Sequence, residues 1–185
     1  MSDVEAAALK KYMLAATHYF EFGAGGSTVM ASECQNLKTV RGAESDPAWI
    51  RQITPFLDCE RCKVDHADIG PVKAWGHPVN IGAQAAKIPN YWKTLEKVVA
   101  EEGVQPDLVF IDGRFRVMCC LTALEVAPAA TLCIHDFTIR PEYHCILPFC
   151  EVIETVGTLI VLRRRGDTDT EQLRKLARLY VADSA

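Results

Sequence analysis

The stretch Tyr19-Phe20-Glu21-Phe22-Gly23-Ala24-Gly25-Gly26-Ser27-Thr28 decides the fold of this 185-residue chain. An apolar, aromatic run ends at three glycines within four positions, and an apolar helical segment follows two hydroxyl residues. This order is typical of a strand, a tight turn and the start of a helix. Glycine permits positive φ and lets a ligand approach the backbone closely, and the first N–H groups of a helix have no intrahelical acceptor. The stretch therefore predicts a site for a small-molecule cofactor.

Predicted strands and helices alternate along the rest of the chain. Strands are expected at 17–22, 38–44, 61–65, 107–111 and 131–134. Helices are expected at 4–15 and 28–35, and a further helix begins at Asp46-Pro47. Another helix ends at Gly103, and the last of this group has an apolar stripe from Val117 to Leu124. Such alternation is typical of a doubly wound α/β fold, in which helices cover both faces of a mostly parallel sheet.

The end of the chain departs from this alternation. Residues 150–155 and 158–163 are two expected strands, and so short a link between them permits only an antiparallel hairpin. A final helix is expected at 170–180, with Thr168 and Glu171 spaced as a capping box. We expect one domain over residues 1–185, within which residues 68–89, rich in glycine and proline, form a lid or substrate loop.

Composition excludes several classes of protein. The formal net charge of −4 does not favour a nucleic-acid or anionic-membrane partner. No apolar run reaches the length of a membrane-spanning helix, and residues 1–11 lack a signal-peptide pattern. Of the eight cysteines, several lie in apolar segments and are expected to be free thiols in a reducing compartment, and Cys59 and Cys62 lack a second pair to complete a zinc site. We therefore expect a cytoplasmic protein.

The carboxyl ends of the strands are where a doubly wound sheet binds its ligands. Glu44 lies 21 positions after Gly23 (44 − 23), where an acid can accept hydrogen bonds from both ribose hydroxyls of a nucleoside, or can cap the next helix. Asp68 follows the third strand and could accept a hydrogen bond from an adenine amino group, or be an ordinary loop acid.

Two further residues bear on the kind of cofactor. Glu21 sits inside a strand end, where an acid could brace the glycine turn or bind a ligand's ammonium group. The dinucleotide pattern GxGxxG needs glycine at position 28, where Thr28 stands. This substitution counts against an NAD-dependent oxidoreductase.

The run from Glu21 to Ser27 resembles the first motif of the class I S-adenosylmethionine-dependent methyltransferases, which have a Rossmann-like fold. Residues 107–113 resemble that family's fourth-strand motif, Glu44 matches its ribose-binding acid, and the terminal hairpin matches its seven-stranded sheet. The resemblance covers residues 19 to about 165 and implies the strand order 3-2-1-4-5-7-6, with strand 7 antiparallel. It implies S-adenosylmethionine as the cofactor, with these binding residues: Glu21, Gly23, Gly25, Gly26, Ser27, Glu44, Asp68 and Asp112.

The sequence departs from that family's pattern in two places. Ser27 replaces the usual third glycine of the first motif, and its hydroxyl can satisfy helix donors instead. No Asn/Asp-Pro-Pro-Tyr tetrad is present, so methylation of DNA nitrogen atoms is disfavoured.

Asp112, His135 and Asp136 follow two neighbouring expected strands and could converge. Catechol-like O-methyltransferases of the same family place divalent-metal ligands at the ends of these two strands, and oxygen ligands with an imidazole suit Mg²⁺ or Mn²⁺. The His-Asp pair here departs from the usual Asp-Asn pair. Without a metal, His135 could act as a general base, or Asp112 and His135 could simply hydrogen-bond to each other. We name Asp112 and His135 as catalytic candidates and assign no metal. If the protein bound a metal ion, Asp112, His135 and Asp136 would be its candidate ligands.

The sequence thus predicts a methyltransferase that transfers the methyl group of S-adenosylmethionine to a small-molecule acceptor through an oxygen nucleophile. The alternatives are a catalytically inactive binding protein of the same fold and, less favoured, an NAD-dependent oxidoreductase. Arg114 and Arg116 could bind a carboxylate or phosphate of the substrate, or Arg114 could pair with Asp112. An exposed apolar face on the leading helix could support a homodimer.

Overall fold

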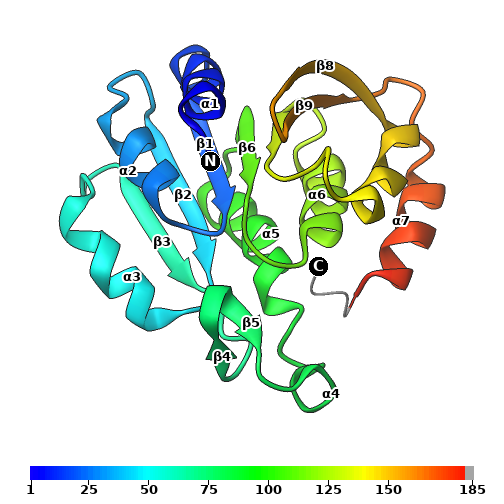
Figure 1. Cartoon of the computed structure of the whole chain (residues 1–185), viewed down its shortest axis with the longest axis horizontal. Coiled ribbons are helices and arrows are strands. Elements are labelled where there is room, and N and C mark those ends of the chain that lie inside the picture. The colour runs from blue at the N-terminus through cyan, green and yellow to red at the C-terminus, as the bar shows by residue number, and fades with distance from the viewer. Residues whose placement is uncertain (182–185) are drawn as a thin grey trace.

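Seven strands form one sheet in the computed structural model, which describes residues 1–181 (Figure 1). Their order is β3-β2-β1-β6-β7-β9-β8, and β9 runs antiparallel to both of its neighbours. The strands are β1 (His18–Phe22), β2 (Thr39–Glu44), β3 (Cys62–His66), β6 (Leu108–Ile111), β7 (Thr131–Ile134), β8 (Cys150–Val156) and β9 (Leu159–Arg164). The expected order and the antiparallel terminal hairpin are confirmed.

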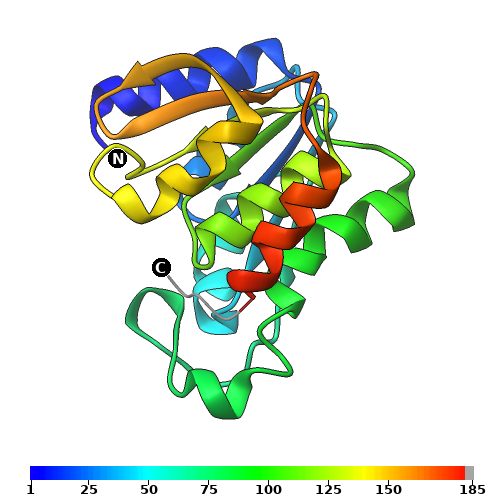
Figure 2. The same cartoon turned by 90° about the vertical axis from the view of Figure 1, so that its right-hand side faces the viewer.

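Helices cover both faces of the sheet (Figure 2). They are α1 (Asp3–Ala15), α2 (Gly26–Glu33), α3 (Pro47–Ile53), α4 (Ile81–Gln84), α5 (Asn90–Glu102), α6 (Arg116–Val126) and α7 (Thr170–Leu179), with a 3-10 segment over Pro141–Phe149. None of the helices in residues 1–181 combines the length and apolar character that crossing a bilayer requires.

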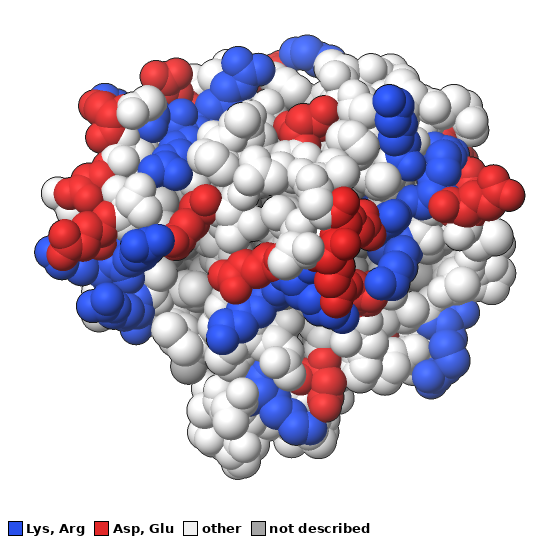
Figure 3. Space-filling model, turned by 180° about the vertical axis from the view of Figure 1, so that it is seen from behind, with Lys and Arg blue, Asp and Glu red and all other residues white. Residues whose placement is uncertain are grey.

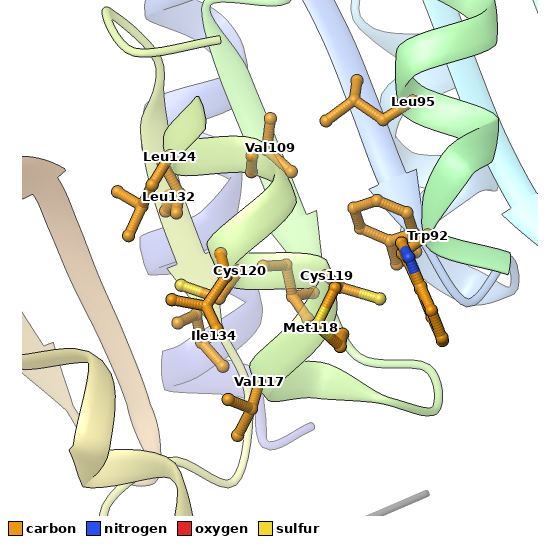
Figure 4. Packing of buried hydrophobic residues seen from close by; sticks show 14 of the residues in the cluster. Trp92, Leu95, Val109, Val117, Met118, Cys119, Cys120, Leu124, Leu132 and Ile134 are labelled. Carbon is orange, nitrogen blue, oxygen red and sulfur yellow. The ribbon is translucent and has the colours of Figure 1, made fainter. Parts of the chain in front are cut away.

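Alternating side chains of the central strands divide the core in two. On β6, Val109 and Ile111 pack with α5, α6 and α7, whereas Leu108 and Phe110 pack with α1 and α2. This period of two is what a strand buried on both faces requires. Figure 4 shows α6 packing Val117 and other apolar side chains against the first of these strand faces. None of the eight cysteines, all of which lie within the described residues, forms a disulfide.

Local capping residues set the ends of three helices. Asp46 caps α3 by accepting hydrogen bonds from the N–H groups of Ala48 and Trp49, and Gly103 ends α5 in the left-handed region at φ 68°. The capping box expected at Thr168 is wrong, because Asp169 caps α7 instead. The hydroxyl of Thr168 donates to the carbonyl of Phe149.

Residues 68–89 hold short elements rather than a bare loop. They contain a two-stranded pair, β4 (Val72–Lys73) and β5 (His77–Pro78), followed by α4. The buried amide of Gln84 donates to the carbonyls of Ile69 and Pro71 and so ties the segment together. Both views show this segment projecting from the body of the molecule (Figures 1 and 2).

The ends of β1 and β6 approach each other closely at two glycines. A Cβ atom on Gly23 would lie 2.5 Å from the Cα of Gly113, and one on Gly113 would overlap the Tyr91 hydroxyl. Gly23 also has φ +91°, a conformation that L side chains rarely adopt. Only glycine therefore fits at this junction.

We expect Gly23→Ala to lower the free energy of unfolding by about 2–4 kcal/mol, because the methyl group meets backbone atoms at positive φ. Gly26→Ala is the matched control, since its Cβ would have no neighbour within 4 Å and alanine favours the helix. Urea unfolding monitored by circular dichroism measures both. Equal midpoints for the two variants would contradict the close approach.

Candidate functional site

A pocket of about 580 Å³ lies at the carboxyl ends of β1, β2 and β6. Six residues expected from the sequence line it: Gly23, Gly25, Gly26, Ser27, Glu44 and Asp112. Sequence reasoning missed other lining residues, among them Met1, Met30, Asp46 and Trp49, whereas Trp75 and Gly76 belong to the expected lid at residues 68–89. The pocket therefore forms where the glycine turn predicts it.

Three hydrogen bonds hold the glycine turn in place. The backbone N–H of Gly23 donates to the carbonyl of Ala43 at 2.9 Å. The indole N–H of Trp49 donates to the carbonyl of Ala24 at 2.7 Å, and the N–H of Gly25 donates to Thr28 Oγ1 at 2.7 Å. The turn is thus fixed from β2, from α3 and from its own helix.

Glu21 braces this turn from below and does not line the pocket, so the structure does not support its expected role in cofactor binding. Its carboxyl group is fully buried and accepts hydrogen bonds from Ser27 Oγ at 2.7 Å, from Tyr19 OH at 2.9 Å and from the Thr28 hydroxyl. Burial raises the pKa of Glu21 to about 7. Of the two expected roles, these contacts fit the bracing of the turn.

Glu44 is a buried acid on the wall of the pocket. Its Oε1 atom accepts the N–H of Ser45 at 2.6 Å and the N–H of Asp46 at 2.9 Å. Burial raises the pKa of Glu44 despite these hydrogen bonds. The capping of α3 falls to Asp46, so the position of Glu44 is compatible with binding a ligand's hydroxyl groups.

Asp68 does not reach the pocket. Its exposed carboxylate pairs with Lys87 at 2.8 Å and accepts the N–H of Gly70 at 2.8 Å. The Lys87 ammonium lowers the pKa of Asp68. The structure therefore does not support the expected contact with adenine, and Asp46 is the additional acid on the pocket wall.

His135 lies behind Asp112, between carboxylates. Its Nδ1 atom is 3.0 Å from Asp112 Oδ1 and 3.5 Å from Asp136 Oδ1, and its Nε2 atom is 3.5 Å from Glu5 Oε2. The hydrogen bond to Asp112 raises the pKa of His135 above its ordinary value. His135 contacts these three carboxylates and does not line the pocket. Only Asp112 of the two catalytic candidates lines the pocket.

Arg116 pairs with two of the three residues that a metal ion would need. The ligand atoms of Asp112, His135 and Asp136 lie within 4.8 Å of one another. However, the buried guanidinium of Arg116 bridges the carboxylates of Asp112 and Asp136 at 3.1 and 3.2 Å. It also donates to the carbonyls of Gly113 and His135. A divalent cation does not fit these residues, because an arginine already balances both carboxylates.

Glu5 was missed by sequence reasoning although it is part of this network. One carboxylate oxygen accepts from the N–H and the hydroxyl of Thr158, at 2.6 and 2.7 Å. The other accepts from the N–H and hydroxyl of Ser2, and these contacts hold the pKa of Glu5 well below its usual range. The Ser-x-x-Glu spacing at residues 2–5 was a visible signal, but the contact with Thr158 joins residues 153 positions apart.

Residues 68–89 contribute to the pocket through Trp75 and Gly76. The Trp75 side chain is 89% exposed, and its backbone adopts φ 63° in the left-handed region. Such a conformation is unfavourable for a bulky residue and is more often kept where a binding site requires it.

The sheet order, the antiparallel β9 and the glycine turn at the pocket together define the fold of the class I S-adenosylmethionine-dependent methyltransferases. A crystal structure of a methyltransferase-like protein from Silicibacter pomeroyi DSS-3 is 31% identical to the chain, with a TM-score of 0.82 over 98% of this chain and 96% of that chain. This chain belongs to the methyltransferase-like proteins of that class.

More distant structures share the fold alone. A functionally unknown protein from Deinococcus radiodurans R1 has a TM-score of 0.53 at 11% identity, over 100% of this chain and 76% of that chain. A candidate tRNA (m1A22) methyltransferase from Streptococcus pneumoniae has a TM-score of 0.51 at 10% identity, over 94% and 76%. No protein-family model and no curated protein matches the chain.

The raised pKa of Glu21 makes stability depend on pH. The folded state favours the neutral acid, so its stabilising contribution is full below about pH 4.5 and is lost as the pH rises through about 7. We expect Glu21→Gln, which cannot titrate, to gain stability relative to the unmodified protein between pH 4.5 and 8, by up to roughly 3 kcal/mol.

Urea unfolding at a series of pH values measures this difference. Glu101→Gln, at an exposed position of α5, is the control, and its difference from the unmodified protein should stay within about 0.5 kcal/mol throughout. A Glu21→Gln difference that does not change with pH would show that the acid is ionised in the folded protein.

Proposed function

We propose that the protein transfers the methyl group of S-adenosylmethionine to an oxygen atom of a small-molecule acceptor. The observation that carries this proposal is the pocket itself. Its volume of about 580 Å³ suits a nucleoside-sized ligand, and it places the glycine turn and Glu44 on one wall in a chain of methyltransferase-like fold.

Two groups of residues would hold the cofactor. Glu44 would accept hydrogen bonds from the ribose hydroxyls, in keeping with its place at the end of β2. Gly26 and Ser27 line the pocket at the first turn of α2, whose N–H groups lack intrahelical acceptors and would bind the amino-acid carboxylate. When bound, S-adenosylmethionine supplies a methyl group already activated by the sulfonium.

Asp112 is the side chain that would receive the proton of an acceptor hydroxyl. It lines the pocket, and His135 and Arg116 fix its orientation from behind. These two neighbours are therefore positioning residues in the proposal. Alignment of the acceptor by the pocket would supply most of the rate enhancement, as expected for an in-line displacement.

We propose that residues 68–89 act as a lid. Trp75 and Gly76 already line the pocket, and the exposed indole of Trp75 has apolar surface to bury over a bound ligand. Closure of this segment would exclude water from the methyl group.

A small acceptor fits the charge distribution better than a nucleic acid does. On the face shown in Figure 3, Lys and Arg side chains are interspersed with Asp and Glu. A protein that binds nucleic acid through its phosphates needs a basic stripe or patch.

A binding protein without catalysis is the second candidate. It is favoured by one observation, the enclosure of His135 between carboxylates, which leaves the site without a histidine base at the pocket. Cofactor binding without methyl transfer to any of a broad panel of hydroxylated acceptors would support it.

We expect titration calorimetry to detect saturable binding of S-adenosylhomocysteine at ligand concentrations below about 1 mM. Glu44→Gln should weaken this affinity by roughly tenfold, because a neutral amide replaces a charged acceptor of ribose hydrogen bonds. Asp68→Asn is the control and should leave the affinity unchanged, since Asp68 lies outside the pocket. Adding Mg²⁺ or EDTA should also have no effect. Failure of the unmodified protein to bind at millimolar ligand would refute the proposal.

A further inference from the structure

A group of basic and polar side chains adjoins the pocket where Gly76 and Gly113 line it. We call Arg114, His77, Arg140 and Tyr143 the arginine cluster. Arg114 directly follows Gly113, and a Cβ atom on Gly76 would lie 3.7 Å from Arg114 Cγ, so the cluster begins where the pocket wall ends. None of these four residues has a role in the proposed binding of the cofactor.

Arg114 is a buried guanidinium without an acidic partner among the described residues. Its residue is only 9% exposed, its Nε atom is buried with no hydrogen-bond partner, and none of the ion pairs within residues 1–181 includes it. Arg116, two positions on, pairs with both Asp112 and Asp136. The sequence left open whether Arg114 would pair with Asp112, and the structure gives that partner to Arg116.

The hydrogen bond that Arg114 does make is to a neutral group. Its Nη1 atom lies 2.6 Å from His77 Nε2, and because arginine can only donate, the imidazole must accept and be uncharged. Burial, followed by the positive charge of Arg114, lowers the pKa of His77 accordingly. Lys73 stands opposite His77 in the β4–β5 pair and adds another positive charge.

Tyr143 and Arg140 bring further unsatisfied donors. The Tyr143 hydroxyl and Arg140 Nε are both buried without a hydrogen-bond partner, and Tyr143 as a whole is only 1% exposed. The guanidinium carbons of Arg116 and Arg140 lie 5.8 and 6.0 Å from the centre of the Tyr143 ring. The single ion pair of Arg140 within residues 1–181, with Glu142 at 3.8 Å, is on exposed atoms.

Three buried donors without partners, on three side chains of one cluster, are unusual because each loses its water on burial. An oxyanion supplies what they lack, since a carboxylate or phosphate accepts several hydrogen bonds and carries the compensating negative charge. We propose that the arginine cluster binds the carboxylate or phosphate group of the methyl acceptor. This inference rests on the proposed function for its placement of the acceptor, which would extend from the cluster toward Asp112.

Inorganic phosphate and acetate are the probes, and nitrogen-15 NMR of arginine Nε–H groups is the readout, with and without S-adenosylhomocysteine. We expect a saturable shift of the Arg114 and Arg140 resonances with at least one of the two anions. Arg114→Gln should weaken binding by roughly tenfold or more. Arg163→Gln is the control, because Arg163 is exposed and pairs with Thr131 at the start of β7, at the opposite end of the sheet.

Tyr143→Phe separates binding from folding. Removing a buried hydroxyl that has no partner should leave the melting temperature unchanged or higher. The same change should weaken anion binding about threefold to tenfold, because the hydroxyl would donate to the anion. A lower melting temperature with unchanged anion affinity would give the hydroxyl a structural role and overturn this part of the proposal.

The outcomes distinguish the two proposals. Anion binding that depends on Arg114 and Tyr143, without binding of S-adenosylhomocysteine, would uphold the anion subsite and refute the proposed function. Binding of S-adenosylhomocysteine with no saturable anion shift up to roughly 50 mM, or with equal anion affinity in Arg114→Gln and Arg163→Gln, would overturn the anion subsite alone. Preference for phosphate over acetate, or the reverse, identifies the group that the acceptor carries.

Discussion

The contact between the backbones of Gly23 and Gly113 is the constraint on which the site depends. It brings the turn after β1 against the turn after β6, and side chains on either residue would force the two apart. Because the strands then diverge into different loops, the space beside this contact becomes the pocket lined by Glu44 and Asp112. The same junction starts the sequence Asp112-Gly113-Arg114, so it also places the arginine cluster next to the pocket.

Four buried or partly buried acids near the pocket differ in what balances their charge. Glu21 meets hydroxyl groups, which cannot offset burial, and its pKa rises to about 7. Glu44 meets backbone N–H groups, whereas Asp112 and Asp136 meet the guanidinium of Arg116 and the imidazole of His135. These environments suit different roles: Glu21 braces a turn, Glu44 can accept a ligand's hydrogen bonds, and Asp112 is held in a fixed orientation at the pocket.

The sequence was sufficient for the fold because the signals that predict it are local. Apolar runs, the glycine turn and the short link between the last two strands each act over a few positions, and they determined the strands and the hairpin. The pocket wall was predictable for the same reason. The directions of the Asp68 and Glu21 side chains were not predictable in this way, because they depend on distant partners, such as Lys87, or on α2 packing over the strand. Glu5 was missed because its partner Thr158 lies at the other end of the chain.

The pairing of Arg116 with the carboxylates of Asp112 and Asp136 determines which ligands the carboxyl ends of β6 and β7 can bind. A metal ion between two carboxylates has open coordination positions that can bind substrate. The Arg116 guanidinium instead uses its N–H donors on the carboxylates and on the carbonyls of Gly113 and His135, so few donors are left for a ligand. Arg116 therefore balances charge inside the protein and makes Asp112 a fixed acceptor. Since no acid among the described residues remains for Arg114, the neighbouring arginine keeps an unbalanced positive charge beside the pocket. One choice of partner thus balances the carboxylates that a metal would need and leaves Arg114 without an acid, as the proposed anion subsite requires.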